Sequence, residues 1–157
     1  MKGALALVLL LASACKEEPP AARRPDKPED TPNFEAAFQH KERWDAEKKA
    51  LVIEMTIAPG FHAYTTGEAT GKPLAVELAP DSDLVATGEI EYPKGTVKDL
   101  SLGRSVIVEG AAQIVAPVAP KEGAASPPHL KGTLRYQICT EKACDRPRSM
   151  KFDLTAS

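Results

Sequence analysis

Apolar and polar residues alternate along most of the chain after residue 34, and a period of two is the pattern of half-buried β-strands. The clearest stretch is Ala50–Ile57, in which every second residue is apolar. Turn sequences such as Pro59-Gly60 and Pro93-Lys94-Gly95 separate the segments. We expect strands at residues 50–57, 61–65, 74–78, 84–92, 106–118, 134–138 and 150–155. So many short strands with turns between them predict an all-β protein built as a β-sandwich.

Residues 34–45 are the one segment with a helical period, and that period is weak. About 120 residues follow the N-terminal segments, which is enough for one hydrophobic core and one domain. The predicted domain therefore covers residues 34–157.

The first 14 residues have the features of an export signal. Near the N-terminus, one lysine precedes an unbroken apolar run from Ala4 to Ala12, which is too short for a bilayer that needs about 20 residues. The sequence Ala12-Ser13-Ala14-Cys15 then resembles a bacterial lipobox. We predict a signal peptide at residues 1–14, lipid attachment at Cys15 and a periplasmic protein anchored to a membrane by that lipid. Signal cleavage without lipid attachment is the alternative.

Residues 15–33 are predicted to hold the lipidated cysteine and a linker. Five of the fourteen prolines lie in residues 16–33, mixed with charged residues, and this composition favours an extended, semi-rigid tether. Over the whole chain, 20 Lys and Arg oppose 22 Asp and Glu, for a formal net charge of −2. Such a balance provides no basic field, which excludes nucleic acid as a partner.

Cys139 and Cys144 lie where one predicted strand ends and the chain turns back into the next. If these strands pair, the two cysteines can face each other with Cα atoms about 4.5–5.5 Å apart, and a disulfide can form. The closed loop has six residues, for which chain entropy contributes only about 2 kcal/mol. Spacing alone leaves open whether the bridge is structural or redox-active. Nearby cations favour a thiolate, and here they outnumber the acids: Arg135, Lys142, Arg146 and Arg148 against Glu141 and Asp145.

The stretch Tyr136-Gln137-Ile138-Cys139, with Cys144 followed closely by Pro147, resembles the signature of the periplasmic N-terminal domain of the thiol:disulfide interchange protein DsbD. Residues 57–64 are similar to the family's segment that ends a strand with Ala-Pro-Gly and an aromatic cluster. Residues 99–103 fall where the family carries its cap loop.

This resemblance runs from about Phe38 to Leu154 and implies an immunoglobulin-like β-sandwich with the cysteine pair on a C-terminal hairpin. It implies thiol–disulfide exchange with thioredoxin-fold proteins of the cell envelope. Cys144 would form mixed disulfides with partners, and Cys139 would resolve them. No cofactor is implied, because the cysteines are the redox group. Since no membrane or thioredoxin-like domain follows residue 157, we expect a stand-alone lipoprotein.

Four further residues are expected around the cysteine pair. The resemblance places His62 and Tyr64 in an aromatic wall, where a histidine could transfer a proton to a leaving thiolate. Asp99 matches the acidic cap position, and a carboxylate near a thiol raises its pKa. Pro147 would shape the turn after the second cysteine. The alternatives are packing at a strand end for the first two residues and a solvated loop acid for Asp99.

Two other functions are compatible with the same residues. A non-catalytic interaction module of the envelope would use the disulfide only to lock a hairpin. A copper-handling lipoprotein would bind Cu(I) through the thiols with Met150 or His62, since soft ligands suit that ion. A zinc site is disfavoured because it wants four ligands, and one cysteine pair with three scattered histidines is present.

Overall fold

The computed structural model describes residues 31–65, 71–101 and 103–157. The signal peptide, Cys15, most of the linker and Leu102 of the expected cap lie outside the described residues. Pro32–Ser157 form one compact unit. Its strands are β1 (Phe38–Asp45), β2 (Ala50–Ile57), β3 (His62–Tyr64), β4 (Ala75–Leu78), β5 (Leu84–Ala86), β6 (Thr96–Leu100), β7 (Gly103–Val108), β8 (Gly110–Pro120), β9 (His129–Tyr136), β10 (Ile138–Cys139) and β11 (Arg148–Thr155). Within the three described ranges no helix is long and apolar enough to cross a membrane.

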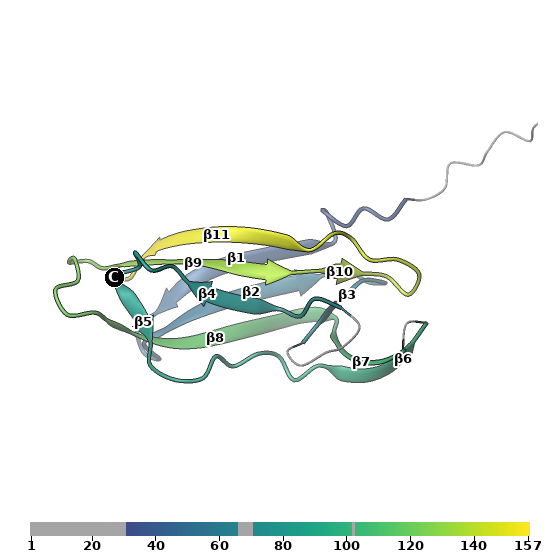
Figure 1. Ribbon diagram of the computed structural model, residues 1–157, viewed down its shortest axis with the longest axis horizontal. Coiled ribbons are helices and arrows are strands. Elements are labelled where there is room, and N and C mark those ends of the chain that lie inside the picture. Colours follow the sequence, from purple (N-terminus) through teal and green to yellow (C-terminus); the bar gives the residue numbers. More distant parts are fainter. Residues whose placement is uncertain (1–30, 66–70, 102) are drawn as a thin grey trace, which may run out of the picture. The chain divides into compact units, whose positions relative to one another are not determined.

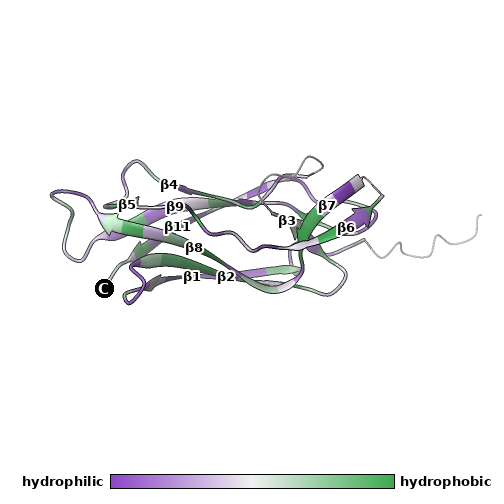
Figure 2. Cartoon of the chain, turned by 90° about the horizontal axis from the view of Figure 1, so that it is seen from below, coloured by the Kyte–Doolittle hydropathy of each residue, from purple (hydrophilic) through white to green (hydrophobic). Residues whose placement is uncertain are grey.

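Two antiparallel layers form the body of this unit. One layer holds the strands in the order β1-β2-β8-β5, and the other holds β11-β9-β4 (Figure 1). In Figure 2, β4, β9 and β11 lie above β8, β1 and β2. A third sheet, in the order β10-β3-β7-β6, continues the unit at one end. This architecture confirms the predicted all-β, immunoglobulin-like sandwich.

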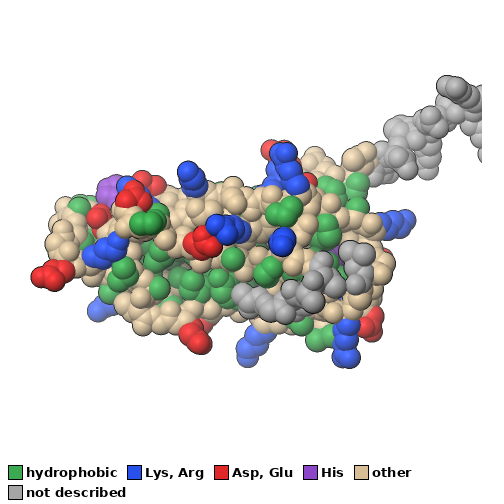
Figure 3. Space-filling model, in the orientation of Figure 1, with side chains coloured by type: hydrophobic (Ala, Val, Ile, Leu, Met, Phe, Trp, Pro, Cys, Tyr) green, Lys and Arg blue, Asp and Glu red, His purple; other side chains and the backbone are tan. Residues whose placement is uncertain are grey.

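The main core is the cluster of buried side chains that includes Leu51, Ile53, Leu74, Ile114, Leu130, Leu134 and Ile138. Strand β2 lies at its centre, paired along its whole length with β1 on one side and β8 on the other. The predicted apolar face of β2 is confirmed, because its four alternating residues are at most 2% exposed: Leu51, Ile53, Met55 and Ile57. At the surface, acidic and basic side chains are interspersed on the face that Figure 3 shows.

Three sequence expectations need correction. The weak helical period at residues 34–45 was misleading, because β1 is an edge strand that pairs with β2 over eight residues and is only partly buried. The strand expected at 84–92 ends at Ala86, and the one expected at 106–118 is interrupted at Glu109 between β7 and β8. Strand β6 was not expected, since four of its five residues are exposed and leave no apolar alternation.

The C-terminal hairpin forms as predicted. Strand β9 pairs with β11 from His129↔Thr155 to Tyr136↔Arg148. Past Tyr136 the chain leaves this sheet, and β10 pairs with β3 instead. The change of sheet at Gln137 places the first cysteine in the third sheet, whereas the returning strand β11 stays in the second.

A substitution at Gly132 tests how closely the β4-β9-β11 layer is packed. A Cβ at this position would lie 2.6 Å from the carbonyl oxygen of Glu77 and 2.4 Å from Cζ of Phe152. We expect Gly132→Ala to lower the free energy of unfolding by about 1–3 kcal/mol, as overpacking does. Urea unfolding followed by circular dichroism measures it. The control Gly88→Ala, whose nearest contact would be 3.8 Å away, should change it by less than about 0.5 kcal/mol; equal effects would contradict this account of the packing.

Candidate functional site

Cys139 and Cys144 form a disulfide across the mouth of a tight loop. The S–S distance is 2.01 Å and the Cα atoms are 4.0 Å apart. The two residues face each other as an antiparallel bridge, between hydrogen bonds from Thr140 N to Ala143 O at 2.7 Å and from Asp145 N to Ile138 O at 2.8 Å. The facing arrangement predicted from the sequence is therefore confirmed. It is the close, non-hydrogen-bonded type of pair.

Two polar side chains hold this loop in place. The Thr140 hydroxyl accepts hydrogen bonds from Ala143 N at 3.1 Å and Lys142 N at 3.3 Å, which closes the turn. The Gln137 amide donates to Asp145 O at 2.9 Å and accepts from Lys72 N at 2.8 Å. Gln137 thus ties both arms of the cysteine hairpin to the segment that leads into β4.

The β10-β3-β7 sheet separates two clusters of side chains. Facing residues of an antiparallel pair project to the same side of a sheet. On one side the pairs Ile138↔Ala63 and Ala63↔Val108 belong to the main core. On the other side lie the pairs Cys139↔His62 and Tyr64↔Ile107. The sheet therefore turns the disulfide away from the main core.

We call the second group the cysteine cluster. It consists of buried Tyr64, Ile107 and Cys139, with Leu100 and Cys144 packed against them. Cys139 is 0% exposed, whereas Cys144 is only partly buried. Since exchange begins with a thiolate reaching a sulfur, this difference makes Cys144 the accessible sulfur and Cys139 the shielded one.

His62 and Tyr64 both lie beside the disulfide. Their rings meet edge to face with centroids 5.4 Å apart. His62 is 3% exposed, and its Nε2 has no hydrogen-bond partner among the described residues. Burial lowers the pKa of His62; Glu109 and Glu141 oppose this shift, and Lys98 adds to it. The imidazole is therefore neutral at neutral pH.

The expected cap is the β6–β7 hairpin. Leu100 packs against the cysteine cluster, and the Ser101 hydroxyl donates a hydrogen bond to Glu141 O at 2.9 Å. The cap thus contacts the cysteine site through Leu100 and the Ser101 hydrogen bond. Asp99 is exposed and faces Arg104 across the hairpin. Because successive strand residues point to opposite faces, Asp99 lies on the side away from Leu100.

Pro147 is exposed in the short segment between Asp145 and β11. A hollow of about 410 Å³ lies beside it, lined by Tyr136, Arg146, Pro147, Arg148, Ser149 and Met150. Arg148 forms an ion pair with Asp145 next to this hollow. Burial acts to raise the pKa of Asp145, but the hydrogen bonds from Arg148 and the Arg146 backbone, together with the charges of both arginines, outweigh it and leave that pKa lowered.

The cationic surroundings predicted for the cysteines are weaker than the residue count indicates. Arg135 pairs with Glu77 at 2.9 Å, and Arg148 pairs with Asp145. In the part of the chain that the structure describes, Lys142 and Arg146 are the nearby cations without an ion pair. Any thiolate stabilisation by cations therefore rests on these two side chains.

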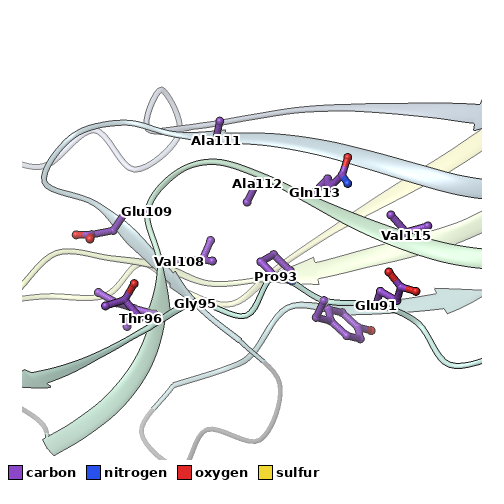
Figure 4. Close-up of a pocket in the computed structure, with 12 residues that line it drawn as sticks. Glu91, Pro93, Gly95, Thr96, Val108, Glu109, Ala111, Ala112, Gln113 and Val115 are labelled. Atoms are coloured by element: carbon purple, nitrogen blue, oxygen red, sulfur yellow. The ribbon is translucent and has the colours of Figure 1, made fainter.

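Neither a second hollow nor the candidate metal ligands form a site of comparable chemistry. A second hollow of about 510 Å³ lies between residues 91–96 and β8, and its lining includes neither cysteine (Figure 4). No group of three or more His, Cys, Asp or Glu side chains that could hold a metal ion occurs within the described ranges. Met150, which the copper hypothesis paired with the thiols, packs against the main core rather than in the cysteine cluster.

A family model for the N-terminal domain of the thiol:disulfide interchange protein DsbD matches residues 29–156. The chain belongs to this family. It is 25% identical to the DsbD N-terminal domain of Neisseria meningitidis, solved in the reduced form, with 80% of this chain and 90% of that one covered at a TM-score of 0.60. The N-terminal periplasmic domain of ScsB from Proteus mirabilis is 15% identical over 76% of this chain and 45% of that one, with a TM-score of 0.47. Comparison with curated sequences gave no match.

Membership confirms the predicted resemblance and the class of chemistry. DsbD N-terminal domains are periplasmic parts of thiol:disulfide interchange proteins. The sequence prediction missed two members of the cysteine cluster in this DsbD-type domain, Leu100 and Ile107. Ile107 lies in the apolar run Val106-Ile107-Val108, in which the sequence does not show the side that each residue faces. Leu100 carries no signal either, since the rest of β6 is exposed.

Ser101→Ala tests whether the cap shields the disulfide. The substitution removes the hydrogen bond between the cap and the cysteine loop, and such a bond contributes about 0.5–1.5 kcal/mol. We expect the disulfide to be reduced about two- to tenfold faster by dithiothreitol, measured as a second-order rate. Ser157→Ala, which changes an exposed serine outside the cap, is the control and should leave the rate unchanged. Unchanged rates for both variants would show that this bond does not keep the cap closed.

Proposed function

We propose that this domain passes reducing equivalents through the Cys139–Cys144 pair to or from thioredoxin-fold proteins of the cell envelope. The observation that carries the proposal is the unequal access of the two sulfurs, with Cys139 at 0% exposure and Cys144 partly open. Family membership supports the exchange chemistry. Thioredoxin-fold proteins suit the role of partner because they carry active-site dithiols that undergo this exchange.

The reaction balances as two successive displacements. In the reduced domain the Cys144 thiolate attacks a disulfide sulfur of the partner, and one partner thiolate leaves. Cys139 then attacks the Cys144 sulfur of the mixed disulfide, and the second partner thiolate leaves. The domain loses two electrons and two protons, and the partner disulfide gains them. The reverse sequence reduces the domain, again through Cys144.

The cap and the hairpin edge would serve this exchange in different ways. Leu100 and Ser101 cover the pair and limit attack by small thiols. Pro147 lacks a backbone N–H, and it borders the hollow lined by residues 146–150 and Tyr136, where a partner could dock. Tyr64 walls the buried sulfur. Attachment of a lipid at Cys15 would keep the domain at a membrane of the periplasm.

Single-cysteine variants test the assignment of the two roles. We expect Cys139→Ala, which keeps Cys144, to form a mixed disulfide with a purified thioredoxin whose one retained cysteine carries a thionitrobenzoate group. The reaction should be at least tenfold faster than with Cys144→Ala, because Cys139 is buried. Release of thionitrobenzoate at 412 nm gives the rate, and mass spectrometry identifies the adduct. Equal rates, or faster reaction through Cys139, would overturn the assignment.

Reduction of the wild-type domain separates exchange from a structural role. The disulfide closes one hairpin, and neither cysteine belongs to the main core. We expect the circular dichroism spectrum and the cooperative unfolding transition to persist after reduction by dithiothreitol. Loss of the folded transition would favour the interaction module, in which the bridge only locks the hairpin.

A further inference from the structure

Buried polar atoms in folded proteins are nearly always hydrogen-bonded, and an unpaired one calls for an explanation. His62 Nε2 is such an atom, since it is buried and has no partner among the described residues. The residue directly opposite His62 across the strand pair is Cys139. The His62 ring, with this unpaired nitrogen, therefore lies on the same face of the sheet as the Cys139 side chain, whose sulfur carries no proton while the disulfide is intact.

We propose that His62 is the proton acceptor for Cys139 when that thiol resolves a mixed disulfide, a role that rests on the proposed exchange function. Reduction of the disulfide gives Cys139 an S–H group, which supplies the missing donor for Nε2. The same nitrogen then removes this proton as the sulfur attacks Cys144. The unpaired atom of the oxidised form is thus explained by its use in the reduced form.

The shielding of Cys139 makes such an acceptor necessary. A thiol in apolar surroundings resists ionisation, because burial disfavours the thiolate. Cys139 is 0% exposed and packs with the side chains of Tyr64 and Ile107. Water has no open path to a sulfur in this position. A neutral imidazole on the same face of the sheet is the base within reach.

Each proton and electron has a destination in this step. His62 takes the Cys139 proton, and the resulting thiolate attacks the Cys144 sulfur. The bond between Cys144 and the partner sulfur breaks, and the partner leaves as a thiolate. The imidazolium then releases its proton to that thiolate or to solvent. In the reverse direction the same nitrogen returns a proton to Cys139 as it leaves the disulfide.

Burial favours the neutral base over the imidazolium at rest, although two of the three charges that face His62 oppose it. Glu109 after β7 and Glu141 in the cysteine loop raise the pKa of the ring, and Lys98 on β6 lowers it. Lys98 and Glu109 pair with each other at 2.6 Å, which offsets much of their separate influence. Burial is the largest influence and lowers the pKa of His62. The lone pair of the ring is therefore available at neutral pH and is lost only under acid conditions.

Rapid mixing of the reduced chain with Ellman's reagent separates the reactions of the two cysteines in time. Attack by Cys144 releases the first thionitrobenzoate at a rate that depends on reagent concentration. Attack by Cys139 on the mixed disulfide releases the second at a rate that does not. We expect His62→Gln and His62→Phe to slow the second release by about 10²-fold, in the range of general base catalysis. The first release should change by less than about twofold, because Cys144 ionises independently.

The pH profile distinguishes proton transfer from a merely structural effect. In the wild type the rate of the second release should rise with pH and level off once His62 is neutral. In the variants it should keep rising, because only hydroxide then ionises the buried thiol. His129→Gln is the matched control, since His129 is exposed and pairs with Asp153, and it should behave as the wild type.

A measurement on the unaltered chain covers the case in which the variants fail to fold. The ¹⁵N chemical shift of His62 Nε2 should differ between the oxidised and reduced forms, whereas the nitrogens of His129 should not. An unchanged shift, or a second release that the folded variants leave at the wild-type rate, would overturn the role of His62 alone. A wild type that releases no second thionitrobenzoate would instead overturn the proposed exchange function.

Discussion

The register of β3 against β10 and β7 is the constraint on which the site depends. This register puts Ile138, Ala63 and Val108 into the main core and leaves Cys139, His62, Tyr64 and Ile107 on the opposite face. A slip of one residue would exchange the two faces and bury the cysteine in the core. The apolar residues of the core therefore fix the position of the Cys139 sulfur.

The disulfide depends on this sheet more than the fold depends on the disulfide. It joins two residues that face each other across one hairpin, whereas β2 and the two layers hold the core together. The Thr140 hydroxyl accepts a hydrogen bond from Ala143 N, and the Gln137 amide donates one to Asp145 O, so bonds other than the S–S bond also hold the loop. A site arranged in this way can be reduced and reoxidised while its surroundings stay folded, which is what an exchange domain requires.

Residues with strong periodicity were predictable from the sequence, and residues placed by distant pairing were not. Alternation of apolar and polar residues predicted strand β2 and the strands of the cysteine-bearing hairpin. The hairpin in turn predicted that Cys139 and Cys144 face each other. Exposed strands such as β6 carry no apolar alternation, so the family resemblance alone placed the cap at residues 99–103, and the contacts of Leu100 and Ser101 come from the structure. The resemblance likewise placed His62 near the cysteine pair, but its burial opposite Cys139 follows from the register of two strands far apart in sequence.

The reduction potential of the Cys139–Cys144 pair tests the central claim most directly. Equilibration with glutathione buffers, followed by quantitative alkylation of the free thiols, gives this value. Exchange with thioredoxin-fold proteins predicts a potential between about −180 and −270 mV, within the span of thiol-exchange proteins. A potential below about −300 mV, which is typical of structural disulfides, would contradict the exchange function and leave the bridge as a lock on the hairpin.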